Sequence, residues 1–286
     1  MEQILFQNSM EGLEMERVVR DYEYSMVTRH FHATCELYYL VEGERYYFID
    51  KQTYRIRAGD AVLIRPNQIH KTSMASESYH SRILLQIAES ILDPVLRASG
   101  LGEMGQVFAG EAVIVSVPEE ERPAVMELFA QIGRELQGRQ RQYEGAVKLK
   151  LAELLLVLSR FQKRSVFEEE KQEVVQTWKH QKVHEVADYL LAHPETGESL
   201  EEVARRFYVS KSYLSRIFKE VTSFTVNEYK IISRIKKSQQ LLADSSCSVT
   251  EISEMLGFEN MTYYERVFKK YVGMTPLKYR RQQQAS

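Results

Sequence analysis

Cysteine is scarce in this chain of 286 residues: only Cys35 and Cys247 are present, far apart in the sequence. Two cysteines can form neither a disulfide framework nor a four-cysteine zinc site, and they fit a reducing, cytoplasmic setting. No run of about 18 or more apolar residues occurs, which predicts that no segment spans a membrane. The first nine residues do not combine a basic region with an apolar one, so we expect no signal peptide.

Signatures of catalysis are also missing. The sequence shows no Ser-His-Asp order, no Cys-His pair and no phosphate-binding glycine loop. Hydrophobic residues make up 44% of the chain and charged residues 27%, which is usual for globular proteins. We therefore predict a protein that is not an enzyme and whose length allows two domains.

Charge is unevenly distributed along the chain, although the formal net charge is only −2. Residues 203–286 contain 15 Lys and Arg against 7 Asp and Glu, a net charge of +8, and the rest of the chain carries −10. Such asymmetry suggests that the C-terminal part alone meets a polyanion such as DNA.

The first of three zones, from about residue 18 to residue 117, has the composition of short strands separated by turns. Predicted strands cover 37–41, 46–49 and 61–64, and predicted turns lie at 42–44, 58–60 and 65–67. Short strands at this spacing suggest a small barrel or sandwich.

Helical periodicity replaces this pattern from residue 119 to residue 163, where two apolar stretches predict a helical hairpin. The second stretch is apolar over a wide arc. It either packs on the barrel or forms a subunit interface, and the sequence leaves both open. Residues 164–177, which include an acidic run, are predicted to be a linker, and the chain is helical again from Trp178.

An internal repeat occupies this last zone. Residues 199–219 align with residues 248–269, at an offset of 49 that becomes 50 after the central turn. Each copy has the pattern of two short helices joined by a tight turn, and each begins with a capping box, Ser199 with Glu202 and Ser248 with Glu251. The pattern predicts two helix-turn-helix units.

The outward face of the second helix in each copy is polar or basic, which suits a helix lying in the major groove of DNA. Arginine can bridge two acceptors of guanine, whereas lysines near a helix end suit phosphates better. The residues predicted to contact DNA are Ser212, Ser215, Arg216 and Lys219 in the first copy and Thr262, Tyr263, Glu265, Arg266 and Lys269 in the second.

The connector between the copies gives a geometric check. Thr225 and Glu228 form another capping box, and a helix from there to about Ala243 would be roughly 28 Å long. Because B-DNA repeats about every 34 Å, such a connector could place the two units in successive major-groove segments. The two faces differ in composition, so we expect them to recognise unlike half-sites.

Residues 183–281 resemble the DNA-binding domain of the AraC/XylS family of bacterial transcription regulators. The resemblance rests on segments 210–219, 256–258, 267–271, 273–276 and 279–280. It implies sequence-specific binding to double-stranded DNA, a homodimer and contact with RNA polymerase. Two positions depart from the family pattern: Ser223 replaces a glycine in a turn, and Tyr264 replaces a core phenylalanine.

The N-terminal zone resembles a cupin, the fold of the AraC-type sensor domain. His30, His32, Glu36 and His70 match the two histidines, glutamate and third histidine with which metal-binding cupins hold Fe, Mn, Ni or Zn. The second motif lacks its usual glycine and is one residue short, so we predict no metal and no cofactor. Instead, we expect a small polar effector, such as a carbohydrate, to be bound by His30, His32, Glu36, Tyr38 and His70.

Taken together, the sequence predicts an α+β multidomain fold: a cupin-like effector-binding barrel (1–118), a helical hairpin for dimerisation (119–163), a linker (164–177) and an all-α DNA-binding domain with two helix-turn-helix motifs (178–286). The predicted function is a cytoplasmic transcription regulator controlled by a small molecule. One alternative is a cupin metalloenzyme with a helical appendage. The other is an effector-binding adaptor that meets a protein partner, which the basic tail disfavours.

Overall fold

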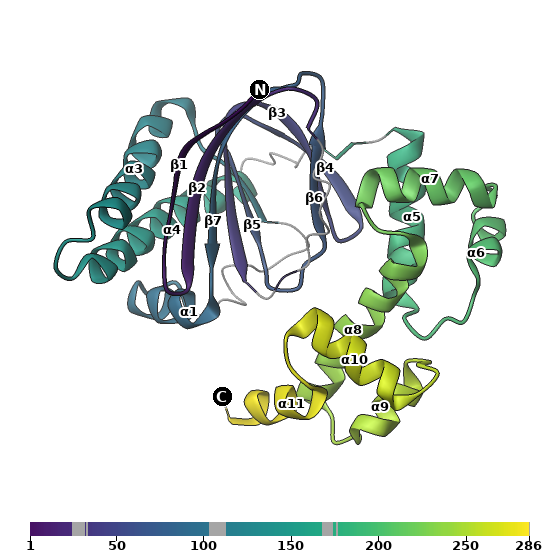
Figure 1. Cartoon of the computed structure of the whole chain (residues 1–286). Coiled ribbons are helices and arrows are strands. Elements are labelled where there is room, and N and C mark those ends of the chain that lie inside the picture. The colour runs from purple at the N-terminus through teal and green to yellow at the C-terminus, as the bar shows by residue number, and fades with distance from the viewer. Residues whose placement is uncertain (25–31, 33, 103–112, 168–173, 176, 286) are drawn as a thin grey trace.

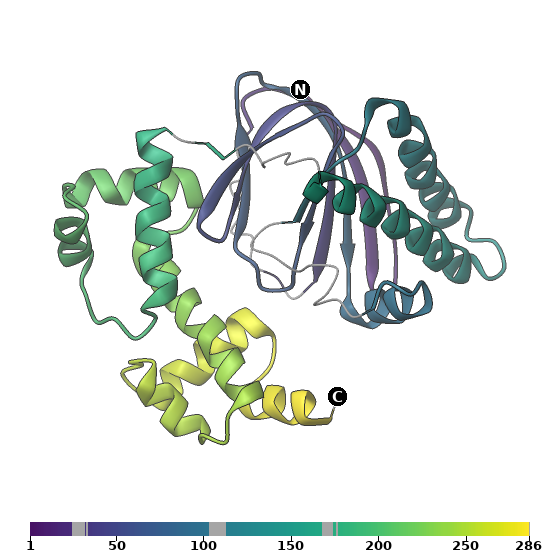
Figure 2. The same cartoon turned by 180° about the vertical axis from the view of Figure 1, so that it is seen from behind.

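The computed structural model describes residues 1–24, 32, 34–102, 113–167, 174–175 and 177–285. A curved β-sheet domain is flanked on one side by helices α3 and α4 and on the other by the C-terminal helices (Figures 1 and 2). This arrangement confirms the predicted α+β fold class. Within the described ranges, no helix is both long and apolar enough to cross a membrane.

Eight antiparallel strands of the described chain form the sheet, in the order β1-β2-β7-β3-β5-β8, with β4 and β6 also paired to β3. β3 therefore belongs to both halves of the sheet and curves it into a barrel (Figure 1). The strands are β1 (Glu2–Met10), β2 (Leu13–Asp21), β3 (Cys35–Ile49), β4 (Gln52–Arg57), β5 (Asp60–Ile64), β6 (His70–Met74), β7 (Tyr79–Ile87) and β8 (Val113–Ser116).

The predicted turn at residues 42–44 is wrong, because β3 continues through it as one strand of 15 residues. The pairing of β3 with β7 shifts register between Leu40 and Glu42, which is a bulge. Gly43 has φ +90°, and a Cβ atom there would lie 2.5 Å from the carbonyl oxygen of Tyr79. Glycine therefore permits a bend within the strand rather than a turn between strands. The predicted turns at 58–60 and 65–67 are confirmed.

The two faces of the sheet pack differently. Alternate residues of β3 and β7, such as Leu37 and Leu85, pack against α1 (Glu89–Ala98), α3 (Arg122–Gly138) and α4 (Tyr143–Phe167). A short 3-10 helix, Glu119–Glu121, precedes α3. The opposite residues face the barrel interior, where Tyr38, Tyr47 and Ile56 lie in a second apolar cluster. The alternation follows from the two-residue period of a strand.

The helical hairpin predicted for 119–163 is present as α3 and α4. The apolar positions of α4, among them Leu151, Leu154 and Leu158, are buried against the sheet, which supports packing on the barrel for these residues. Leu149 belongs to the same sequence stretch but is 73% exposed. The predicted linker starts too early, because α4 continues to Phe167, and Val174 and Val175 bond to β4.

The C-terminal domain contains seven helices among the described residues. Two apolar cores lie at opposite ends of the long helix α8, one with α5 to α7 and one with α9 to α11 (Figure 1). The helices are α5 (Trp178–Ala192), α6 (Leu200–Arg206), α7 (Lys211–Thr222), α8 (Val226–Asp244), α9 (Val249–Met255), α10 (Met261–Val272) and α11 (Pro276–Ala285).

Candidate DNA-binding and effector sites

The two predicted helix-turn-helix units are the helix pairs α6–α7 and α9–α10. The predicted capping boxes of Ser199 and Ser248 are both formed, and Ser210 caps α7. Asn260 plays the same part at α10, where its side chain accepts a hydrogen bond from the Tyr263 backbone N–H at 2.8 Å. These local bonds define both turns.

Left-handed residues occur at matching places in the two units. Tyr208, between α6 and α7, has φ +56°, and its counterpart Gly257 has φ +70°. Ser223, which departs from the family pattern, has φ +68° at the end of α7, like Gly273 at the end of α10 with φ +83°. The family geometry is thus retained at Ser223, although a non-glycine residue adopts this conformation at some cost in free energy.

The residues predicted to contact DNA lie on α7 or α10 and none of them is fully buried, although Tyr263 packs against the second apolar core. Arg216 lies over the ring of Tyr213 at 5.1 Å, and Arg266 lies over the ring of Tyr263 at 5.3 Å. The same aromatic-arginine arrangement therefore occurs at matching positions in both units. Exposed are Ser212, Arg216, Lys219, Thr262, Glu265, Arg266 and Lys269; Ser215 and Tyr263 are half-buried.

Tyr264 faces the core, as predicted, and is fully buried. Its hydroxyl shares a buried hydrogen bond with Ser238 of α8. Burial raises the pKa of Tyr264 to about 12. The tyrosine at this position therefore ties the second unit to the connector helix, a contact that phenylalanine could not make.

Arg234, near the middle of α8, bonds both to the loop that leads into the first unit and to the turn of the second. Its guanidinium donates to the carbonyl oxygens of Pro194 at 2.9 Å and Thr196 at 3.0 Å, before the first unit. It also donates to the carbonyl oxygen of Gly257 at 2.7 Å, in the turn of the second unit. One side chain thus links the loop before the first unit, the connector and the turn of the second unit, and no sequence pattern marked Arg234 for this role.

Replacing Arg234 with alanine should weaken binding to a complete two-part DNA site by about tenfold or more, because charged hydrogen bonds contribute about 1.5–3 kcal/mol. Binding to DNA with a single half-site should change little. Lys230→Ala is the matched control, since Lys230 bonds to the Glu198 carbonyl beside the first unit and, among the described residues, to no group of the second. Fluorescence anisotropy with both DNAs measures the effect, and equal losses on both would refute a role in relative positioning.

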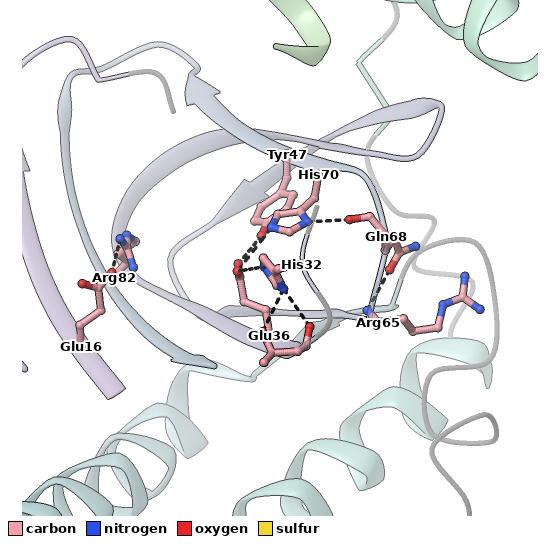
Figure 3. Close-up of polar contacts among 9 residues, drawn as sticks. Glu16, His32, Glu36, Tyr47, Arg65, Gln68, His70 and Arg82 are labelled. Atoms are coloured by element: carbon pink, nitrogen blue, oxygen red, sulfur yellow. Dashed lines mark hydrogen bonds and ion pairs between the residues drawn. The ribbon is translucent and has the colours of Figure 1, made fainter. Parts of the chain in front are cut away.

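Four polar side chains meet inside the barrel (Figure 3). Glu36 of β3 is fully buried and accepts a hydrogen bond from the Tyr47 hydroxyl at 2.9 Å. Its other oxygen lies 3.3 Å from Nε2 of His32 and 3.4 Å from Nε2 of His70. His32, Glu36 and His70 thus come together as predicted, and Tyr47 joins them without having been predicted as a site residue.

The charges in this cluster depend on one another. Burial alone would raise the pKa of Glu36, but the charge of His70 and hydrogen bonds from His32 and His70 hold it well below its usual value. Burial likewise disfavours charge on His70, yet the carboxylate of Glu36 raises the pKa of that imidazole. The pair therefore favours an ionised glutamate beside a protonated histidine.

The ligand atoms of His32, Glu36 and His70 lie within 4.8 Å of one another, so this set could also hold a metal ion. Tyr38 is buried in the same interior and packs edge-on against Tyr47, with ring centroids 5.3 Å apart. His30, the remaining predicted effector-binding residue, lies outside the described residues.

The barrel contacts the C-terminal domain through the turn between β3 and β4. Asp50 in this turn forms an ion pair with Lys236 of α8 at 2.6 Å, and the Tyr229 hydroxyl donates to its carbonyl oxygen. Lys51 pairs with Asp188 of α5 at 2.8 Å. Helix α5 and the connector helix α8 are thus bonded directly to the barrel, which lies beside them in Figure 2.

A chain of hydrogen bonds joins this contact to the polar cluster. Nδ1 of His70 lies 2.9 Å from the Gln68 carbonyl oxygen, and the Gln68 amide donates to Asp50 at 3.0 Å. The Ile69 backbone N–H also donates to Asp50, at 3.2 Å. The consecutive residues Gln68, Ile69 and His70 therefore connect Glu36, inside the barrel, with Asp50, which bonds to the DNA-binding domain.

Family comparisons agree with both halves of this architecture. Residues 13–155 match the AraC-like ligand binding domain, and residues 203–282 match a helix-turn-helix domain family. The first match alone spans half of the chain.

Among similar proteins, the HTH-type transcriptional activator RhaR of Salmonella dublin is 24% identical over 91% of this chain and 89% of its own length. The Msm operon regulatory protein of Streptococcus mutans is 35% identical, but only over 32% of this chain, and the chain matches 34% of that protein. ToxT from Vibrio cholerae, a solved structure, is 13% identical over 97% of this chain and all of its own, with a TM-score of 0.40.

Proposed function

Because this chain belongs to the AraC family of helix-turn-helix transcription regulators, we propose that a small effector bound inside its barrel controls how its two helix-turn-helix units bind one bipartite DNA site. The observation that carries the proposal is the bonded path from Glu36 and His70 to Asp50 and Lys236. It connects the candidate effector site with the connector helix between the two units.

DNA recognition is assigned to the outward residues of α7 and α10. Arg216 and Arg266 are suited to guanine, and Ser212, Ser215 and Thr262 to more permissive contacts with base edges. Lys219 and Lys269, near the helix ends, are suited to phosphates. Because the two faces differ, each chain should recognise two unlike half-sites about one helical turn apart.

The effector is assigned to His32, Glu36, Tyr38 and His70, which combine charged groups and a hydroxyl inside the barrel. Such a set suits a molecule rich in hydroxyl groups, such as a sugar. Any effector that alters the Glu36–His70 pair acts on a residue bonded through Gln68 to Asp50. The physical coupling is then a change in how firmly the barrel holds α8.

We further propose that the chain acts in the cytoplasm, that it forms a homodimer and that it contacts RNA polymerase. Helix α4 lies on the side of the barrel away from the C-terminal helices (Figure 1), and its residue Leu149 is exposed. This placement supports dimerisation through the helical hairpin, because a partner there would leave α7 and α10 accessible.

Lys236→Met should uncouple the effector from DNA binding. The variant keeps the length of the side chain but removes the ion pair with Asp50, so the change in DNA affinity caused by the effector should fall towards none, from a typical coupling of about 5- to 150-fold. Affinity for the effector itself should stay the same. Lys237→Met is the control, since Lys237 is exposed and lies next in the helix. Equal coupling in wild type and Lys236→Met would show that the contact does not transmit the signal.

A footprint on the DNA upstream of the chain's own gene, with and without candidate effectors, tests the proposal directly. We expect a protected site whose occupancy changes with one of the effectors. Absence of specific protection under every condition would contradict the proposal.

A cupin metalloenzyme is the second candidate, favoured by the three metal-capable residues His32, Glu36 and His70. It requires stoichiometric metal that is lost in His32→Ala. Elemental analysis of the purified chain separates the two candidates, because the effector proposal requires no bound metal.

A further inference from the structure

Three arginines are buried in the barrel next to the polar cluster. Arg20 of β2, Arg45 of β3 and Arg82 of β7 have exposed fractions of 6%, 0% and 6%. The strands are neighbours in the sheet order, since β7 lies between β2 and β3. Buried arginines are rare in protein interiors unless they are paired, so these three call for an explanation.

Among the described residues, the three arginines have fewer carboxylate partners than positive charges. Arg20 donates to Glu2 at 2.9 Å, but Glu2 is 38% exposed at the barrel rim. Arg82 donates to Glu16. Arg45 donates only to the backbone carbonyl oxygen of Tyr24, and no carboxylate of the described residues pairs with it.

Each guanidinium also keeps buried nitrogen atoms that make no hydrogen bond within the described structure. These atoms are one Nη of Arg20, one Nη of Arg82, and both Nε and one Nη of Arg45. The buried hydroxyl of Tyr38 is in the same condition. A buried donor without an acceptor costs about 1–3 kcal/mol, and more when it is charged, so four such nitrogen atoms indicate a missing acceptor.

Tyr38 places these donors beside the effector cluster. The guanidinium of Arg82 lies 5.8 Å from the centre of the Tyr38 ring, and that ring packs against Tyr47, which bonds to Glu36. Burial and the charge of Arg45 together lower the pKa of the neighbouring His80 to about 4. One end of the interior is therefore strongly cationic, and Glu36 makes the other end anionic.

We infer that Arg20, Arg45 and Arg82 form an anion-binding subsite inside the barrel, which holds a carboxylate or phosphate group of the effector. Guanidinium groups match both anions with paired N–H donors. Glu36, His32 and His70 then bond to hydroxyl groups at the other end of the same molecule. The effector is thus a hydroxylated organic anion, such as a sugar acid or a sugar phosphate. This inference rests on the proposed effector site and narrows its chemistry.

Stability without ligand gives the first test. If the anion partner of Arg45 is absent without ligand, Arg45→Met should leave the melting temperature of the full chain unchanged or raise it. The substitution removes a buried charge that has no counter-ion. Arg82→Met is the contrast, since it removes the partner of Glu16 and should lower the melting temperature. A fall of about 10 °C in Arg45→Met would overturn the inference, because it would show that the guanidinium is already paired.

Binding gives the second test. Isothermal titration of the full chain would compare glucose, glucuronate, glucose 6-phosphate and inorganic phosphate at equal ionic strength. We expect at least one anion to bind and Arg45→Met to weaken it at least tenfold, whereas Arg55→Gln, a surface arginine paired with Glu44, should not. Comparison of the affinities for glucuronate and glucose 6-phosphate shows whether the subsite holds a carboxylate or a phosphate group.

Two outcomes would overturn the inference: binding of none of the anions, or equal binding by wild type and Arg45→Met. Failure of the proposed function is a different result. In that case the anion binds through Arg45, but the affinity of the chain for DNA does not change.

Discussion

Arg216→Ala should weaken binding to the preferred DNA site by about 1–3 kcal/mol, or 5- to 150-fold, and should relax sequence choice at the contacted base pair. Arg216 is exposed on α7, and its ion pair with Glu220 spans 3.7 Å at the surface. Because exposed ion pairs contribute little, Arg216 can exchange this partner for a guanine at small cost. Competition binding with substituted DNA sites measures both effects.

Lys219→Ala provides the comparison for Arg216. Lys219 is exposed near the end of α7, where a phosphate contact is expected. Its loss should weaken binding to all sequences alike and reduce the dependence of affinity on salt. If Arg216→Ala also weakened all sequences alike, Arg216 would be a phosphate contact and not a base contact.

Glu36→Gln should destabilise the barrel by about 3–5 kcal/mol near pH 6, which is the usual effect of breaking a buried ion pair. Glutamine keeps the size of the side chain and can accept from Tyr47, but it leaves a buried His70 without its counter-charge. Urea unfolding followed by circular dichroism measures the loss. Glu42→Gln is the control, because Glu42 is exposed and its side chain accepts a hydrogen bond from the Tyr79 hydroxyl at the surface; it should change stability by less than about 0.5 kcal/mol.

The effect of Glu36→Gln should depend on pH in a defined direction. Folding lowers the pKa of Glu36, so its contribution is present above the ordinary value of 4.5 and is lost as the pH falls through the lower folded value. Folding raises the pKa of His70, so its contribution is complete below 6.5 and is lost as the pH rises through the raised value. The difference between wild type and variant should therefore be largest between pH 4.5 and 6.5. A difference independent of pH would contradict the ionised pair.

The C-terminal domain could be predicted from the sequence almost completely, because its determinants are local. Ser199 with Glu202, and Ser248 with Glu251, are capping signals that act within four residues, and the apolar period of α7 and α10 fixes which face is buried. The role of Arg234 could not be predicted in this way, because its three acceptors lie 23 to 40 residues away in the sequence.

The barrel was predicted less well, because its structure depends on pairing between distant strands. Glycine at position 43 has the composition of a turn, and only the approach of the Tyr79 carbonyl shows that it lies in a bulge. The bulge also changes which residues of β3 face the interior. Before it the even-numbered residues do, as at Tyr38; after it the odd-numbered residues do, as at Arg45 and Tyr47. Because the sequence does not reveal this shift, it could not assign Arg45 and Tyr47 to the interior, and the cationic end of the barrel was not predicted.

Selection of binding sites from random DNA by the full chain tests the central claim most directly, namely that two unlike units of one chain recognise one bipartite site. We predict an enriched sequence with two different half-sites whose centres lie about 10–10.5 base pairs apart. Arg216→Ala should lose information in one half-site and Arg266→Ala in the other. Enrichment of a single half-site, or of no sequence at all, would contradict the account.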